Sequence, residues 1–193
     1  SWHYHIFSSF QTYEKINILE IGTFDGKFAN FLSSIFPNAE IYTLDLPDND
    51  PRFISSYRRK DNKKREQFII DRNKRLQKKN IFQLKMDSKD MINKFEPNFF
   101  DYIWIDGDHR DPQVSTDIEN SIKLVKSKGI ICCDDVIMKS FKNEYVSNES
   151  YLKLDYLEKK QILINNFFVK RCTKNNAILK KFISVSYLKN KSE

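Results

Sequence analysis

The chain has 193 residues, of which 40% are hydrophobic, and a formal net charge of +7 at pH 7. That length suits a single domain over residues 1–193 with a core of ordinary size. No run of residues approaches the roughly 20 apolar positions of a membrane-spanning helix, and the N-terminal residues lack the pattern of a signal peptide. The three cysteines form neither a disulfide framework nor a Cys-x-x-Cys metal motif, which favours a reduced, cytoplasmic protein.

Predicted strands and helices alternate along most of the chain. Short apolar runs predict strands at residues 16–21, 39–44, 81–84, 99–105 and 129–133. Helical patterns lie between them, at residues 27–35, 53–79, 88–95 and 111–125. After the fifth strand we expect a helix over 151–164 and an antiparallel pair formed by 167–169 and 177–179, with a turn at 174–176. Such alternation is typical of a doubly wound α/β domain with a mostly parallel, Rossmann-like sheet.

A glycine-containing turn follows the first predicted strand, with the sequence Glu20-Ile21-Gly22-Thr23-Phe24-Asp25-Gly26. Gly22 and Gly26 let the backbone pass close to a ligand, and the helix start after them offers free N–H groups. Asp45 ends the second strand, where a carboxylate can bind both hydroxyls of a ribose. Together, these features predict a nucleoside cofactor at this edge of the sheet.

The charge of the turn separates two classes of nucleoside cofactor. A dinucleotide enzyme would show Gly-x-Gly-x-x-Gly, with the pyrophosphate at the helix N-terminus. Here Phe24 stands at the position of the second glycine, and Asp25 would repel a phosphate. Glu20 and Asp25 instead suit the positive sulfonium and amino groups of S-adenosylmethionine. The sequence therefore favours this methyl donor.

Acidic side chains follow the fourth and fifth predicted strands. Asp106 and His109 come after the fourth strand, and Asp134-Asp135 comes after the fifth. Because the carboxyl ends of neighbouring parallel strands meet at one edge, we expect the three acids to converge beside His109. Oxygen ligands of this kind suit a hard divalent cation such as Mg²⁺. Acids at strand ends also serve as plain helix caps, and that alternative stays open.

These features together resemble the motif series of class I S-adenosylmethionine-dependent methyltransferases over about residues 16–136. The series comprises Glu20-x-Gly22-x-x-x-Gly26, Asp45, Met86-Asp87-Ser88, Asp106-Gly107-Asp108-His109 and Gly129. The resemblance implies a seven-stranded sheet whose last hairpin carries the one antiparallel strand. It also implies a set of cofactor-binding residues, namely Glu20, Gly22, Thr23, Phe24, Asp25, Gly26, Asp45, Leu46, Asp87, Ser88 and Asp106.

Within that set, the resemblance implies distinct positions along the cofactor. Glu20 and Gly22 would lie near its methionine end, and Asp45 would bind the ribose. Asp87 and Ser88 would lie against the adenine. A helix cap is the alternative role for Asp87.

The acids after the fourth and fifth strands resemble those of metal-dependent O-methyltransferases, especially the branch that acts on sugar hydroxyls. That resemblance implies that Asp106, Asp134 and Asp135 hold magnesium and that His109 is the base. The family often has Glu-Asp where this chain has Asp134-Asp135, so one ligand is a methylene shorter. A loop histidine bonded to an acid is the structural alternative for His109.

A basic insertion over residues 47–79 separates the second and third predicted strands. Between Arg52 and Lys79 there are twelve Lys or Arg residues and three acids, which give a local charge of +9 that exceeds the +7 of the whole chain. Such a segment is usually a solvated helix, here with Phe68, Ile69 and Ile70 turned inward. It could also bind a phosphate of the acceptor, through Arg58, Arg59, Lys63, Lys64 and Arg65.

The function that the sequence favours is methyl transfer to a hydroxyl of a saccharide, a nucleotide-linked sugar or a similar small acceptor, one that can carry phosphate. Two alternatives stay open. The first is an RNA-directed methyltransferase that uses residues 52–79, although the motifs disfavour nucleic acid as the partner. The second is a nonenzymatic Rossmann-like binding module. The N-terminal Trp2-His3-Tyr4-His5 receives no role, and a homo-oligomer remains compatible with the sequence.

Overall fold

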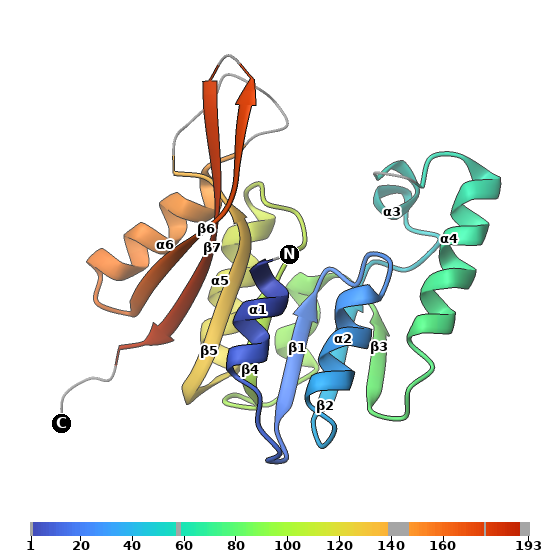
Figure 1. Cartoon of the computed structure of the whole chain (residues 1–193), viewed down its shortest axis with the longest axis horizontal. Coiled ribbons are helices and arrows are strands. Elements are labelled where there is room, and N and C mark those ends of the chain that lie inside the picture. The colour runs from blue at the N-terminus through green and yellow to red at the C-terminus, as the bar shows by residue number, and fades with distance from the viewer. Residues whose placement is uncertain (1, 57–58, 139–146, 176, 190–193) are drawn as a thin grey trace.

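The computed structural model describes residues 2–56, 59–138, 147–175 and 177–189, which form one seven-stranded sheet with helices on both faces (Figure 1). The strand order is β3-β2-β1-β4-β5-β7-β6, with β1 to β5 parallel and β7 antiparallel to both of its neighbours. The strands are β1 (Asn17–Ile21), β2 (Glu40–Asp45), β3 (Ile81–Lys85), β4 (Phe100–Ile105), β5 (Val125–Val136), β6 (Leu163–Asn175) and β7 (Ala177–Leu188). The predicted seven-stranded Rossmann-like sheet with a C-terminal antiparallel hairpin is confirmed.

Helices cover the sheet on both sides. One face carries α1 (Trp2–Ser9) and α2 (Lys27–Ile35), and the other carries the 3-10 helix η1 (Ser88–Asn93), α5 (Gln113–Leu124) and α6 (Glu149–Lys159). The basic segment forms α3 (Pro51–Ser55) and α4 (Asn62–Arg75), between β2 and β3. No helix within the described ranges is long and apolar enough to cross a membrane.

The core has two layers, one on each face of the sheet. Ile18 and Trp104 face α1 and α2, whereas Leu19 and Ile103 lie in the layer beneath α5 and α6. Successive residues of β1 and β4 are therefore buried on opposite faces, as expected of apolar runs in a parallel sheet covered on both sides.

The strand order places the carboxyl ends of β1 and β4 side by side. The backbone N–H of Asp106 donates to the carbonyl of Ile21 at 2.8 Å, and that of Gly22 donates to the carbonyl of Leu44 at 2.8 Å. The chain order of the strands reverses at this point of the sheet, where open α/β sheets bind their ligands. The β6–β7 hairpin extends beyond this edge in Figure 1.

Several boundaries differ from the sequence prediction, and the helix predicted over 53–79 is divided into α3 and α4. The helix predicted over 151–164 ends at Lys159, because Gln161 takes a φ of 58° and the N–H of Ile162 donates to Leu157 O, a left-handed helix cap. Ile164 therefore belongs to β6. Likewise, Val125 begins β5 instead of continuing α5.

The N-terminal helix α1 was not predicted. It has no acidic residue in its first turn and no basic residue in its last turn, and packing stabilises the helix instead. Phe7 is fully buried and makes edge-to-face contacts with Phe28 and Trp104, at ring distances of 5.3 and 5.6 Å. Such aromatic pairs stabilise beyond their buried area.

Candidate functional site

The turn after β1 passes against the end of β4. Gly22 has a φ of +101°, and a Cβ at this position would lie 2.2 Å from the carbonyl oxygen of Asp106. Both the conformation and the close approach therefore require glycine. Gly26, with a φ of +72°, precedes the first residue of α2. The turn is thus held close to the end of β4, where a cofactor could lie across both strands.

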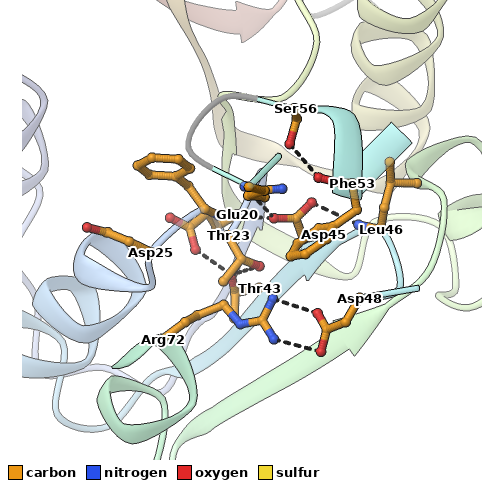
Figure 2. A network of polar contacts seen from close by, with 12 residues as sticks. Glu20, Thr23, Asp25, Thr43, Asp45, Leu46, Asp48, Phe53, Ser56 and Arg72 are labelled. Carbon is orange, nitrogen blue, oxygen red and sulfur yellow. Dashed lines mark hydrogen bonds and ion pairs between the residues drawn. The ribbon is translucent and has the colours of Figure 1, made fainter. Parts of the chain in front are cut away.

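A buried polar chain lies beneath this turn (Figure 2). The hydroxyl of Thr43 donates to Glu20 Oε2 and lies 2.6 Å from the hydroxyl of Thr23. Burial raises the pKa of Glu20 well above its ordinary value, and the nearby charges of Asp106 and Asp45 raise it further. An acid in this position favours a positively charged ligand, whose charge would stabilise the carboxylate.

Asp45 lies at the end of β2, and both of its carboxylate oxygens have polar partners. Its carboxylate accepts from the backbone N–H of Leu46 at 2.9 Å and of Phe24 at 3.2 Å. Arg59 reaches the same carboxylate at 3.4 Å. The Arg59 guanidinium also lies over the Phe53 ring, 4.1 Å from its centre. The structure thus brings Asp45 and Leu46 to the glycine turn.

Asp87 and Ser88 follow β3, as predicted. Asp87 caps η1 by accepting from the N–H of Lys89 at 3.1 Å, and it also pairs with Arg52 at 2.8 Å. Asp87 therefore does cap a helix, and its carboxylate also forms the ion pair with Arg52. Ser88 is buried and accepts from Gln113 Nε2 at 2.6 Å.

At the end of β4, His109 and Asp106 face each other. Nε2 of His109 lies 3.5 Å from Asp106 Oδ1, while the buried Nδ1 has no hydrogen-bond partner among the described residues. Burial works to lower the pKa of His109, but the bond to Asp106 and the charges of Asp106, Asp135 and Asp134 outweigh it and raise the pKa above 6.5. The structure therefore brings His109 and all three predicted acids within electrostatic reach of one another.

The acid pair after β5 is occupied by lysines. Lys170 Nζ donates to Asp134 Oδ2 and, at 2.9 Å, to Asp135 Oδ1, while Lys181 Nζ donates to Asp135 Oδ2. Within the described part of the chain, no three metal-binding side chains lie close enough together to hold a metal ion. In this arrangement, the residues predicted to hold magnesium do not fit a divalent cation.

The family of the chain follows from its sequence match. The model of a methyltransferase domain family matches residues 19–136, which include the glycine turn, Asp45, Asp87 and the acids after β4 and β5. The chain belongs to this methyltransferase family. With the seven-stranded sheet, the match identifies a class I S-adenosylmethionine-dependent methyltransferase. No curated protein matches the sequence significantly.

Solved structures share the fold of this methyltransferase at low sequence identity. A provisionally assigned caffeoyl-CoA O-methyltransferase from Staphylococcus aureus superimposes with a TM-score of 0.67 and 15% identity, over 98% of this chain and 84% of the other. An rRNA methylase from Streptococcus thermophilus gives 0.64 and 11%, over 96% and 94%. A precorrin-6y C5,15-methyltransferase from Geobacter metallireducens gives 0.60 and 12%, over 96% and 87%. At these identities, the likeness shows the fold alone.

Several arginine side chains of the basic segment are buried or bonded within the protein. Arg72 is fully buried and pairs with Asp48 at 2.9 Å (Figure 2), and Arg75 donates to the carbonyl of Asp25 at 2.9 Å. Arg59 is equally engaged with Asp45, so it is no surface phosphate ligand; Arg58 lies outside the described residues. The prediction that Ile70 turns inward is wrong, because its side chain is 60% exposed.

Some residues of the site were missed in the sequence. Lys170 and Lys181 lie on the terminal hairpin, far along the chain from the acids they contact, and the residues around them form no motif. Helix α1 brings His3 within electrostatic reach of Asp106 and Lys170, and burial lowers the pKa of His3 to about 4. Only the contacts between distant strands and helices show these residues to be part of the site.

Asp117 gives a testable prediction of how the stability of the protein depends on pH. It is fully buried on α5, and burial raises its pKa to about 6. Because this folded-state pKa lies above the unfolded value of 3.8, the contribution of Asp117 to stability is fully present below about pH 4 and lost as the pH rises through 6. At pH 7 the loss is about 3 kcal/mol. Asp117→Asn should therefore be the more stable protein at pH 7 and not at pH 4.

Urea unfolding at both pH values measures this difference. Asp90→Asn, which changes an exposed acid of η1, is the matched control and should follow the wild type at both. A gain for Asp117→Asn that is equal at the two pH values would contradict the assigned pKa.

Proposed function

We propose that the chain methylates a hydroxyl of a saccharide, a nucleotide-linked sugar or a similar small acceptor, with His109 as the base. The observation that carries the proposal is the pairing of His109 with Asp106 through Nε2, which leaves the buried Nδ1 to accept a proton. A base held by a third group beside the reacting position is the arrangement that activates a weak nucleophile. An alcohol needs such help because its pKa lies far above neutrality.

The residues at the turn fit the methyl donor. Glu20 and Asp25 would lie near its positive methionine end, with Gly22, Thr23, Phe24 and Gly26 forming the backbone turn around it. The buried Glu20 is the strongest support for this donor, because burial raises its pKa and a cationic ligand beside it would stabilise the carboxylate.

The nucleoside part of the donor has its own set of residues in this proposal. Asp45 and Leu46 would hold the ribose, and Asp87 and Ser88 would lie against the adenine. Asp106 lies between the turn and His109, so it would face both cofactor and acceptor. S-adenosylmethionine supplies an electrophilic methyl group on a positively charged sulfur.

The transfer step follows from these positions. With the donor bound, the acceptor oxygen would form a bond to the methyl carbon while the carbon–sulfur bond breaks, and the electron pair of that bond would stay on sulfur. The hydroxyl proton passes to Nδ1 of His109, and Asp106 stabilises the imidazolium that results. Much of the acceleration would come from holding oxygen and methyl group in line.

Magnesium was part of the hypothesis drawn from the sequence, with Asp106, Asp134 and Asp135 as its ligands. The chemistry of three carboxylates suits such an ion. Two of these acids are engaged by Lys170 and Lys181, so the mechanism here contains no step through a metal.

Isotope transfer tests the proposed function. The protein is incubated with S-adenosylmethionine carrying a ¹³C-labelled methyl group, in separate reactions with sugars, nucleotide sugars and total RNA. The proposal expects the label as an O-methyl ether on a small hydroxylated acceptor, identified by its NMR shift. Label found instead on nitrogen, on carbon or on RNA would contradict it, and label on RNA would direct attention to the exposed lysines of α4, Lys63, Lys64 and Lys74.

A further inference from the structure

Two strand irregularities direct Lys170 and the acid pair toward one another. The pairing of β6 with β7 shifts its register at Lys170. The pairing of β5 with β7 shifts at Asp134 and Asp135, and Asp135 has a φ of 48°. Bulges of this kind re-aim side chains and are frequent beside active sites. Here they bring an ammonium group from one side of β7 to two carboxylates on the other side.

The contact between these groups is largely shielded from water. The side chain of Lys170 is 21% exposed and that of Asp134 only 2%. Burial works to lower the pKa of Lys170, but the charges of Asp134 and Asp135 and their hydrogen bonds to Lys170 outweigh it, so the pKa is raised. A buried carboxylate is stable only when it is paired or neutralised.

Lys170 and Lys181 engage three of the four carboxylate oxygens of the acid pair, and Asp134 Oδ1 is left without a hydrogen-bond partner among the described residues. Magnesium requires several oxygen ligands in a near-octahedral arrangement. Asp134 Oδ2 and Asp135 Oδ1 already accept from Lys170, and Asp135 Oδ2 accepts from Lys181. A divalent ion would have to displace both lysines and lie close to their charges.

We propose that Lys170 is the resident cation of the acceptor site, in the place where related hydroxyl-methylating sites would hold a metal. The inference rests on the proposed function and adds the group that faces the acceptor oxygen. An ammonium has three N–H donors, of which Asp134 and Asp135 take two. The third donates to the acceptor oxygen, stabilises the negative charge that develops there and orients it beside His109.

The charges of the site agree with this role. Asp106, Asp134 and Asp135 bring three negative charges, and Lys170 and Lys181 bring two positive ones. A hydroxylated acceptor suits such a site, because the oxygen that accepts a hydrogen bond from Lys170 can direct its own proton toward His109. Binding of such an acceptor would then require no metal ion.

Manganese binding tests the proposal without any acceptor. Mn²⁺, a paramagnetic substitute for Mg²⁺, is titrated into the full chain and followed by electron paramagnetic resonance. The wild type is expected to bind no Mn²⁺ below about 1 mM, because Lys170 holds the carboxylates. Lys170→Met, which releases Asp134 Oδ2 and Asp135 Oδ1 and leaves only the bond of Lys181 to Asp135, should bind Mn²⁺ roughly 10- to 100-fold more tightly. Lys170→Arg keeps the charge and should resemble the wild type.

Lys181→Met is the matched control, because Lys181 contacts Asp135, whereas Asp134 is contacted by Lys170. Its gain in Mn²⁺ affinity should be smaller than that of Lys170→Met. The proposal is overturned if the wild type binds one Mn²⁺ in the micromolar range and Asp134→Asn abolishes that binding. This wild-type titration decides the matter even if Lys170→Met fails to fold.

Binding of S-adenosylhomocysteine, measured on the same samples, separates this proposal from the proposed function. If the wild type binds neither S-adenosylhomocysteine nor Mn²⁺, the methyl-transfer function is refuted, whereas the occupation of the acids by Lys170 is not. Once an acceptor is known, the wild-type rate should be equal with Mg²⁺ and with chelator. Lys170→Met should then lose about 100-fold in kcat and Lys170→Arg much less; a fully active Lys170→Met would refute the role.

Discussion

Replacing His109 with alanine is expected to lower kcat by about 10²- to 10⁴-fold, the usual range for loss of a general base. The variant loses the proton acceptor but none of the residues proposed for the methyl donor, so binding of S-adenosylhomocysteine should be unchanged. Steady-state kinetics with the acceptor found by isotope transfer, together with calorimetry, measure both quantities.

The pH profile gives the same test a second readout. A base must be unprotonated, and the surrounding carboxylates raise the pKa of His109 above 6.5. The rate of the wild type should therefore rise with pH through a midpoint above 6.5, and this rise should vanish in His109→Ala. Asp108→Asn is the control, because Asp108 pairs with the exposed Arg110 beside the site, and its rate should stay within about two-fold of the wild type. Full activity of His109→Ala would refute the base assignment.

Gly22→Ala is expected to destabilise the protein by at least about 3 kcal/mol, combining backbone strain with a steric clash. Its φ of +101° is unfavourable for alanine, and the new Cβ would lie 2.2 Å from Asp106 O, so the turn and the end of β4 must separate. Thermal unfolding should show a fall in Tm of roughly 6 to 12 °C. Because the turn itself is displaced, binding of S-adenosylhomocysteine should be lost.

Gly107→Ala provides a matched control on the opposite side of the contact. Its added Cβ would lie 3.6 Å from its nearest neighbours, which is ordinary van der Waals contact. This variant should keep a near-wild-type Tm and still bind S-adenosylhomocysteine. If Gly22→Ala binds the ligand as well as Gly107→Ala does, the turn after β1 is not the cofactor site.

Local patterns in the sequence predicted the elements that carry the cofactor end. The helix expected over 27–35 has those bounds in the structure, and Asp45 ends β2 as predicted. Both follow from short-range signals, an apolar run bounded by glycine or by acids. The position of Asp106 beside Gly22 followed from strand order, since neighbouring parallel strands end at one edge.

The sequence could not show how the acids are neutralised. Lys170 reaches Asp134 because of a bulge in β6, and a one-residue shift in register is invisible in a strand read from its composition. Arg59 was interpreted as a surface charge, but its stacking on Phe53 and its pairing with Asp45 place it inside the site. In each case a contact over a long sequence distance decides the role of the charge.

Calorimetric titration of the wild type with S-adenosylmethionine tests whether the turn after β1 binds the methyl donor. We expect one binding site of roughly micromolar affinity, unchanged by Mg²⁺ or chelator and weakened in Asp45→Asn. No binding heat at several temperatures, in a sample shown to be folded by circular dichroism, would contradict the assignment of the turn after β1 as the site of the methyl donor.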